Sequence, residues 1–274
     1  MSQLSAPQIR RRKRRDGAEP IVMVTAYDEP SARYVDAAGV DMILVGDSVA
    51  NVMLGHDDTL HIDVDVIVHH VRAVAAAKTS AHVVGDLPWL SYHVDRADTV
   101  RNAAAIIRAG ASSVKLEGGV VRVEMVRALV DAEIPVMGHL GLTPQSVLAF
   151  GGFKVQGKTR EAAKMLVEDA LALEDAGVYA MVVEGVPSEV GRRITEAVSV
   201  PVIGIGAGPD TDGQVLVFHD LLGLSNRTPA KFVRQYADLG AQITDAVSRY
   251  ARDVRENTFP GPNETYATPP ELLD

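Results

Sequence analysis

The 274-residue sequence contains no cysteine. Disulfide bonds, thiolate metal ligands and cysteine nucleophiles are therefore excluded, and thiol redox chemistry is excluded with them. A chain without cysteine is compatible with a reducing compartment, and we expect a cytoplasmic protein.

The sequence also lacks a long apolar run and an excess of positive charge. No stretch approaches the roughly 18 to 20 apolar residues that a membrane span needs, so no membrane partner is expected. The 27 basic residues are outnumbered by 36 acidic ones, and the formal net charge is −9. Because nucleic-acid binding requires a basic face, this balance favours small molecules as ligands.

The two ends of the chain differ in composition from the rest. Residues 10–15 are all basic, and no apolar segment of the kind found in a signal peptide follows them. Residues 1–19 are predicted to form a basic, solvated helix or tail, with an anionic contact or a targeting role as the alternative. Prolines and a glycine between positions 260 and 270 predict an irregular tail over residues 258–274.

Between these ends, helix-type stretches alternate with short apolar runs. An Ala-Gly pair or a proline precedes most of the runs. Glycine suits the end of a helix and proline suits the first position of a strand, so both indicate a passage from helix to strand. The predicted strands are 21–24, 42–45, 82–85, 113–116, 136–137, 179–183 and 202–205.

Short strands that are apolar throughout are typical of a parallel sheet buried on both faces. Their number predicts an α/β protein with a (β/α)8 TIM barrel over residues 20–257, rather than a doubly wound open sheet. An eighth strand is expected at 214–217, with a short or missing helix between it and the seventh. A long helix is expected from about residue 229 to residue 257, because its apolar side chains are three and four residues apart.

Ionisable residues gather at the carboxyl ends of the predicted strands, which in a barrel share the face that carries catalysis. Oxygen ligands without cysteine and with one nearby histidine suit Mg²⁺ better than zinc. The candidate metal ligands are Asp47, Asp86 and Glu117. The other ionisable residues of this set are Lys115, His139 and Glu184.

Each of these residues also has a plainer interpretation. Asp86 could be a turn or helix-cap carboxylate, and Lys115 and Glu117 could form an internal ion pair on one side of their strand. Glu184 ends an apolar strand, where burial raises the pKa of a carboxyl group towards that of an effective general base. Its alternative is a surface turn. His139 fits a substrate hydrogen-bond donor and a buried structural histidine equally well.

Two glycine-rich segments are further candidates for function. Residues 204–208 resemble a turn that binds phosphate through backbone N–H groups, although glycine-rich turns are also common packing devices and no basic residue accompanies this one. Residues 141–160 are too many for an ordinary connection. We expect them to form an active-site loop that covers the mouth of the barrel.

Seven short motifs follow one another along the chain. They are Thr25-Ala26-Tyr27-Asp28, Val45-Gly46-Asp47-Ser48, Asp86-Leu87-Pro88, Val114-Lys115-Leu116-Glu117-Gly118-Gly119, Gly138-His139-Leu140-Gly141-Leu142-Thr143-Pro144-Gln145-Ser146, Gly151-Gly152-Phe153-Lys154-Val155-Gln156-Gly157 and Pro201-Val202-Ile203-Gly204-Ile205-Gly206-Ala207-Gly208. Over roughly residues 21–250 the chain resembles, in register, the ketopantoate hydroxymethyltransferase family. An ordered series of this kind is far more specific than any single motif.

The resemblance implies a particular reaction. A hydroxymethyl group passes from 5,10-methylenetetrahydrofolate, the co-substrate, to 3-methyl-2-oxobutanoate through an Mg²⁺-stabilised enolate. The product is 2-dehydropantoate, for pantothenate biosynthesis. The resemblance also implies a homo-oligomer, commonly a decamer.

Roles for individual residues follow from their places in the motifs. By this resemblance Asp47 and Asp86 correspond to Mg²⁺ ligands that also contact substrate, with Glu117 in the metal site directly or through water. Glu184 corresponds to the catalytic base. The remaining substrate-binding positions are Ser48, Lys115 and His139.

Two other interpretations remain open. A barrel of the phosphoenolpyruvate mutase and isocitrate lyase type also uses Mg²⁺ and a Gly-Asp-Ser segment on 2-oxo acids, but the lyases of that group use a catalytic cysteine that this chain lacks. A non-catalytic barrel that binds small anions through residues 204–208 is the other possibility. It would leave Glu184 without a role.

Overall fold

The computed structural model describes residues 3–225, 227–267 and 269. The chain forms two compact units. One contains the residues up to Phe218 together with residues 230–233, and the other contains residues 219–229 and those from 234 onwards.

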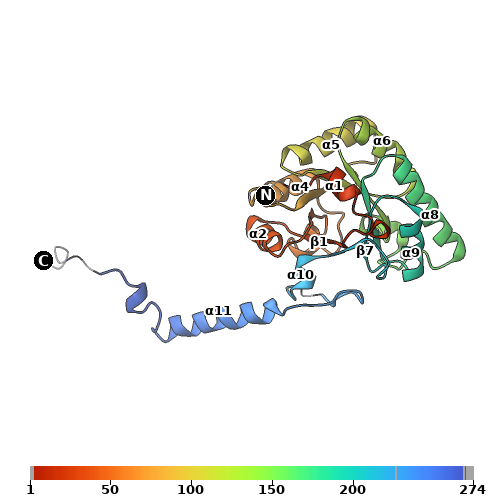
Figure 1. Cartoon of the computed structure of the whole chain (residues 1–274). Helices are drawn as coiled ribbons and strands as arrows, with labels where there is room; N and C mark the ends of the chain where they lie inside the picture. Colours follow the sequence, from red (N-terminus) through yellow and green to blue (C-terminus); the bar gives the residue numbers. More distant parts are fainter. Residues whose placement is uncertain (1–2, 226, 268, 270–274) are drawn as a thin grey trace. The chain divides into compact units, whose positions relative to one another are not determined.

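In the first unit, parallel strands close into a barrel in the order of the sequence (Figure 1). The (β/α)8 prediction is confirmed, including its eighth strand. Residues 206–212, all within the described part, contain no helix between the seventh and eighth strands. The strands are β1 (Ile21–Thr25), β2 (Met42–Val45), β3 (His82–Asp86), β4 (Ser113–Glu117), β5 (Val136–Gly141), β6 (Ala180–Glu184), β7 (Val202–Ile205) and β8 (Gly213–Leu216).

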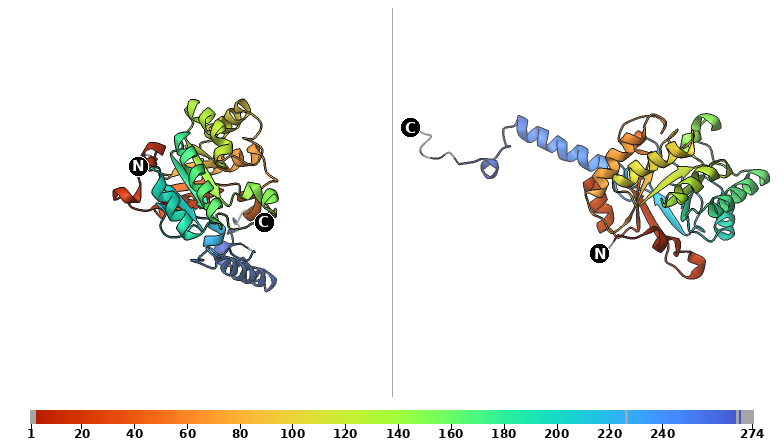
Figure 2. Two further views of the ribbon diagram at one scale, coloured as in Figure 1. Left: turned by 90° about the vertical axis from the view of Figure 1, so that its right-hand side faces the viewer. Right: turned by 90° about the horizontal axis from the view of Figure 1, so that it is seen from above.

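Helices cover the outside of the barrel, as Figures 1 and 2 show from three sides. The longer ones are α2 (Glu29–Ala37), α4 (Val64–Ala75), α5 (Arg96–Arg108), α6 (Val123–Asp131), α8 (Arg160–Asp175) and α9 (Ser188–Ala197). Several begin at a side chain that accepts a backbone N–H of the first turn, which satisfies a donor that has no partner within the helix. These capping residues are Asp28, Asp63, Asp95 and Thr159.

Short helical turns lie in the loops that follow the strands. They are α3 (Val49–Val52), η2 (Val120–Arg122), η3 (Pro144–Ser146) and α7 (Val147–Phe150). The last two divide the 141–160 segment, so this connection has helical structure of its own. Leu148 and Phe153 in this segment are 75% and 54% exposed.

The basic N-terminal segment packs against the barrel. Helix α1 (Ala6–Arg10) forms within it, and a 3₁₀ turn, η1 (Arg14–Asp16), follows. The segment is not solvated throughout, because Ile9 and Lys13 are fully buried. The Nζ atom of Lys13 lies 2.8 Å from Oδ2 of Asp212 and 3.0 Å from the carbonyl oxygen of Val200. Burial of this ammonium group is tolerated because it is both ion-paired and hydrogen-bonded.

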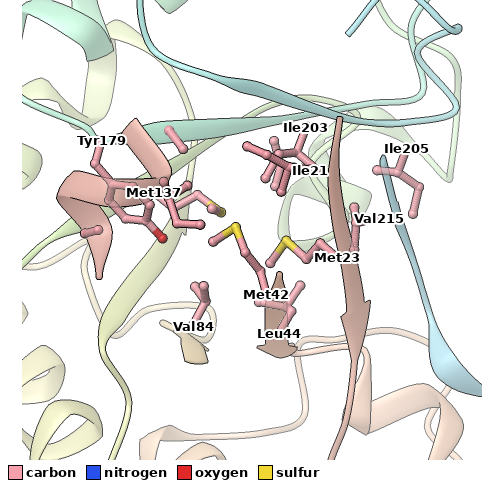
Figure 3. Packing of buried hydrophobic residues seen from close by; sticks show 14 residues of the cluster. Ile21, Met23, Met42, Leu44, Val84, Met137, Tyr179, Ile203, Ile205 and Val215 are labelled. Atoms are coloured by element: carbon pink, nitrogen blue, oxygen red, sulfur yellow. The ribbon is translucent and has the colours of Figure 1, made fainter. Parts of the chain in front are cut away.

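Side chains fill the interior of the barrel (Figure 3). Met23, Met42 and Met137 point towards one another, and Ile9 of α1 belongs to the same buried cluster. Methionine adapts to irregular interior gaps, so this part of the barrel is a packed core. In a barrel of this kind the catalytic residues lie at the carboxyl ends of the strands.

The second unit contains α11 (Leu239–Arg255), together with most of the short helix α10 (Phe218–Leu221) and the turn η4 (Pro262–Glu264). The helix predicted from residue 229 was wrong in its first part. It begins at Leu239, where the side chain of Asp238 accepts the N–H of Ala241 at 3.2 Å. Residue 268 and residues 270–274 of the predicted tail lie outside the described residues.

One face of α11 is apolar and exposed. Ile243, Val247 and Tyr250 are 53%, 59% and 55% exposed. Taking the described residues together, none of the helices is long and apolar enough to span a bilayer.

Candidate active site

The register of the strands brings the predicted site residues to one end of the barrel. Asp86 is level with Lys115 across β3 and β4, and Glu117 is level with His139 across β4 and β5. Glu184, the last residue of β6, is level with the end of β5. Three successive strand pairs therefore place these side chains side by side at the carboxyl face.

Asp86 lies at the centre of the buried polar groups. Its Oδ2 atom is 2.8 Å from Nζ of Lys115 and accepts the backbone N–H of Asp47 at 3.1 Å. Its Oδ1 atom is buried and has no hydrogen-bond partner among the described residues. A buried carboxylate oxygen without a donor is energetically unfavourable, so this atom is available to a ligand.

Carboxyl groups outnumber ammonium groups around Asp86. Burial, together with repulsion from Asp47 and Glu117, raises the pKa of Asp86 to about 8, although Lys115 opposes the shift. Burial alone would lower the pKa of Lys115, but attraction to Asp86, Glu117 and Asp47 raises it above its usual value. A single ammonium group thus faces three carboxyl groups, an arrangement that favours binding of a further cation.

His139 stands between two carboxyl groups. Its Nδ1 atom lies 3.1 Å from Oε1 of Glu117, and its Nε2 atom lies 3.3 Å from Oε2 of Glu184. Burial, followed by the charge of Lys115, lowers the pKa of His139. The ring is therefore neutral, and its single N–H can serve only one of the two carboxyl groups at a time.

Glu184 is more accessible than the acids beneath it. Its side chain is 16% exposed, compared with 2% for Glu117 and 1% for Asp86. Burial is the main cause that raises its pKa, and the hydrogen bond with His139 opposes the rise. An acid with these properties can accept a proton from a ligand at the mouth of the barrel.

Ser48 follows Asp47 and is half-buried. Its Oγ atom lies 2.8 Å from the hydroxyl of Tyr27, and Nδ1 of His70 lies 2.7 Å from the carbonyl oxygen of Tyr27. The hydroxyl of Ser48 is thus held beside Asp47, at the same end of the barrel.

The structure adds two residues that the sequence did not suggest. Gln145 donates from Nε2 to Oδ2 of Asp47 at 3.0 Å, and its backbone N–H donates to Oε2 of Glu117 at 3.0 Å. Tyr92 donates its hydroxyl proton to Oε1 of Gln145 at 2.6 Å. Gln145 lies within a motif but carries no charge, and Tyr92 had no sequence signal. Neither residue lies at the end of a strand, where the ionisable residues of the site are found.

The donor set fits a metal ion that takes few protein ligands. In the part of the chain that the structure covers, no three His, Asp or Glu side chains form a group that could hold a metal ion. Asp47 and Asp86 lie together, whereas Glu117 is occupied by Gln145 and lies beside His139. Mg²⁺ is commonly bound by one or two carboxylates, with water and substrate as its other ligands.

Residues 204–208 have a packing explanation. Gly206 has φ 62°, and a Cβ atom there would lie 2.6 Å from Cδ1 of Phe232. At Gly208, also with positive φ, a Cβ would lie 2.5 Å from Cβ of Ser188. Close neighbours account for these glycines without a bound anion.

Solved structures share the fold. The chain is 17% identical, with a TM-score of 0.61, to 2,3-dimethylmalate lyase, described as a PEP mutase/isocitrate lyase superfamily member; the match covers 98% of this chain and 94% of that one. Phosphonopyruvate hydrolase in complex with oxalate and Mg⁺⁺ is 14% identical with a TM-score of 0.57, over 95% of this chain and 93% of that one.

Sequence relatives are much more similar. The 3-methyl-2-oxobutanoate hydroxymethyltransferase of Syntrophomonas wolfei subsp. wolfei is 53% identical, over 100% of this chain and 99% of the relative. The protein of the same name from Methylobacterium sp. (strain 4-46) is 57% identical over 91% of this chain and 86% of its own length. A family model described as ketopantoate hydroxymethyltransferase matches residues 3–262. This chain therefore belongs to the ketopantoate hydroxymethyltransferase family.

Proposed function

We propose that this protein transfers a hydroxymethyl group from 5,10-methylenetetrahydrofolate to 3-methyl-2-oxobutanoate, giving 2-dehydropantoate. Family membership supports the overall reaction. The structural observation that carries the proposal is the position of Glu184, a partly exposed acid of raised pKa, beside the buried cluster of Asp86, Lys115 and His139. Such a pairing suits removal of a proton next to a carbonyl group.

Mg²⁺ is part of the proposal. Asp47 and Asp86 would hold it, because Oδ1 of Asp86 is buried with no hydrogen-bond partner in the described part of the chain and Asp47 lies beside it. Glu117 would act on the metal through water, since its Oε2 atom already accepts the N–H of Gln145. When bound, the metal supplies Lewis-acid polarisation of the 2-oxo group, which acidifies the proton on C3. The complex of phosphonopyruvate hydrolase with oxalate and Mg⁺⁺ provides a precedent on the same fold.

Lys115, Ser48 and His139 would orient the substrate. Lys115 keeps its charge because its pKa is raised, and this charge would attract the carboxylate of a 2-oxo acid. The hydroxyl of Ser48 can donate to the same anion while Tyr27 holds it in place. His139, neutral because burial lowers its pKa, can donate only one hydrogen bond at a time.

Glu184 would remove the C3 proton. The bond between C3 and this hydrogen breaks, the proton moves to a carboxyl oxygen of Glu184, and the electron pair becomes available at C3. Water adds to the one-carbon unit of the folate, both of its C–N bonds break, the two protons of water pass to the nitrogens, and tetrahydrofolate leaves. C3 then bonds to the formaldehyde carbon so formed, the carbonyl π electrons move to its oxygen, and the proton held by Glu184 passes to that oxygen to give the hydroxyl group. A carboxyl group with a raised pKa holds a proton more readily than an ordinary one, and burial provides this shift at Glu184.

The decisive experiment is product formation. Purified protein with 3-methyl-2-oxobutanoate, Mg²⁺ and 5,10-methylenetetrahydrofolate should form 2-dehydropantoate, detected by mass spectrometry, and tetrahydrofolate in equal amounts. Omission of the folate should stop the reaction. Folate-independent cleavage of a 2-oxo acid would contradict the proposal and favour chemistry of the lyase or mutase type.

We also propose that the protein is a homo-oligomer, with a decamer as the assembly that the family resemblance suggests. The exposed apolar face of α11 supports an assembly, because a helix face of this kind is normally covered by another surface. A second copy of the chain is the partner proposed here. A cytoplasmic location is compatible with a chain that has no cysteine to oxidise.

A further inference from the structure

We infer that Gln145 and Tyr92 are positioning residues, which together fix the orientation of Asp47 and Glu117 for the metal and the substrate. The inference rests on the proposed function, because it gives these carboxylates their task. Neither residue is expected to touch the reacting atoms. Their effect is exerted through the two carboxylates that they hold.

The pair forms a continuous set of hydrogen bonds. Gln145 donates from its backbone N–H to Glu117, and its side-chain Nε2 donates to Oδ2 of Asp47 and to the carbonyl oxygen of Leu87, each at 3.0 Å. Tyr92 donates its hydroxyl proton to Oε1 of Gln145 at 2.6 Å. The backbone N–H of Glu117 donates in turn to the hydroxyl oxygen of Tyr92 at 3.2 Å.

Backbone groups at both ends fix the direction of every bond in this set. The N–H of Glu117 can only donate, so the hydroxyl of Tyr92 accepts there and uses its single proton on Gln145. Oε1 of Gln145 is thereby the acceptor, and its NH₂ group must face Asp47 and Leu87. The carbonyl of Leu87 can only accept, which makes the opposite orientation of the amide unfavourable.

Both residues are buried, which strengthens their hydrogen bonds electrostatically. Tyr92 is 1% exposed and Gln145 is 5% exposed. A buried polar network that is fully satisfied holds its members in one arrangement, whereas a network that loses a member leaves unpaired polar groups.

The consequence for the site is a fixed separation of two carboxylates from different strands. Asp47 follows β2 and Glu117 ends β4, yet both accept hydrogen bonds from one residue of the turn η3. The amide of Gln145 donates to one oxygen of Asp47, and this hydrogen bond restricts the orientation of the carboxylate. The loop after β5 therefore completes the carboxylate site when it folds.

Substitutions that remove single hydrogen bonds test this arrangement. Gln145→Met keeps the length of the side chain but removes its donor and acceptor, and Tyr92→Phe removes only the hydroxyl. Ser91→Ala is the matched control for Tyr92→Phe, because the buried hydroxyl of Ser91 donates only to the carbonyl oxygen of Pro88, at 2.6 Å. Mn²⁺ binding to the full-length protein would be measured by electron paramagnetic resonance, Mg²⁺ binding by competition, and thermal unfolding in parallel.

We expect Gln145→Met to weaken Mn²⁺ and Mg²⁺ binding by about tenfold or more, as substitutions behind metal ligands commonly do. Tyr92→Phe should weaken binding in the same direction, and the double variant should bind no more weakly than Gln145→Met, because the two residues act as one unit. Ser91→Ala should leave metal affinity unchanged even if it lowers the unfolding temperature. In steady-state kinetics, saturating Mg²⁺ should restore most of kcat to Tyr92→Phe.

Three results would overturn the inference. Wild-type metal affinity in a folded Gln145→Met or Tyr92→Phe protein would show that the pair does not position the carboxylates. Additive losses in the double variant would show that the residues act separately. If the wild-type protein binds neither Mn²⁺ nor Mg²⁺, or if Asp47→Asn does not weaken their binding, the proposed metal site itself is wrong and this inference is wrong with it.

Discussion

The α-carbon of Gly141 lies directly against the backbone of Glu184. The two residues are level with each other on β5 and β6, and Gly141 has φ 91°. A Cβ atom at position 141 would lie 2.2 Å from the carbonyl oxygen of Glu184, and that same oxygen accepts the N–H of Leu142 at 2.7 Å. The backbone position of Glu184, the proposed base, therefore requires glycine at position 141, because a side chain there would overlap the carbonyl oxygen of Glu184.

Gly141→Ala is therefore expected to displace Glu184. The new methyl group cannot fit unless the ends of β5 and β6 move. In addition, the positive φ of residue 141 adds about 1–3 kcal/mol of backbone strain for a residue other than glycine. Catalytic activity should fall at least tenfold while the protein remains folded, as measured by kcat and circular dichroism. Gly152→Ala is the control, since Gly152 has φ 115° but no atom of the residues that the structure describes lies within 4 Å of a Cβ placed there. Equal losses of kcat in the two variants would show that backbone strain alone lowers the activity.

Glu184→Gln tests the base directly. The amide cannot take a proton, so exchange of the C3 proton of 3-methyl-2-oxobutanoate in deuterated water should slow by about 10²- to 10⁴-fold, the usual contribution of a general base. Mg²⁺ binding should be retained, because Glu184 contacts His139 rather than the proposed metal ligands. Nuclear magnetic resonance would follow the exchange.

Glu189→Gln is the matched control for this experiment. It makes the same chemical change on α9, where the carboxylate is exposed and bound to Arg192 and Arg193. Normal exchange is expected there. A Glu184→Gln protein that exchanges at the wild-type rate would show that another group removes the proton.

The positions of the strands were predictable because the physical signals for them are local, and the predicted bounds of β2 and β7 match the structure. The bounds of other strands were less exact: β5 continues four residues beyond the predicted end at residue 137. The start of the last helix was not predictable from periodicity, which continued back to Phe232. The true start depends on the capping bond of Asp238 to the N–H of Ala241, and an aspartate alone does not reveal that bond.

The ionisable part of the site was also predictable, because barrel topology brings the ends of strands together. The uncharged residues of the site were not predictable. Gln145 belongs to the site because it lies within hydrogen-bond distance of Asp47 and Glu117. No spacing in the sequence predicts that proximity. The burial of Lys13 was missed for the same reason, since its partner Asp212 lies far along the chain and a run of basic residues is usually solvated.

His82 is expected to make stability depend on pH. It is fully buried, with Nδ1 2.9 Å from the carbonyl oxygen of Leu4 and Nε2 2.8 Å from Oγ of Ser113. Burial lowers its pKa in the folded protein below that in the unfolded chain. Below about pH 6.5 the unfolded chain binds a proton here that the folded protein does not, so the free energy of unfolding falls by up to about 1.4 kcal/mol per pH unit. Above that pH the residue makes no such contribution.

The measurement is the change in unfolding free energy between pH 7.5 and pH 5.5 for the wild type and for His82→Gln. The wild type should lose more than the variant over this interval, by at most about 1.4 kcal/mol. Asp86 and Glu117, whose pKa values are raised to about 8, act in the opposite direction, but they are present in both proteins and cancel in the comparison. His69→Gln, at an exposed position, should behave like the wild type. Identical pH slopes for the wild type and His82→Gln would contradict this account.

The apolar face of α11 gives a test of assembly. Ile243 and Val247 are one turn apart and both more than half exposed, at 53% and 59%. If a second copy covers them, the double substitution Ile243→Asp and Val247→Asp buries two charges at the interface and should convert the oligomer to smaller species in light scattering after gel filtration. Ser248→Asp adds a charge to another face of the same helix and should leave the mass unchanged. A wild-type protein that is already monomeric at micromolar concentration, or a double variant with the wild-type mass, would show that this face does not join copies of the chain.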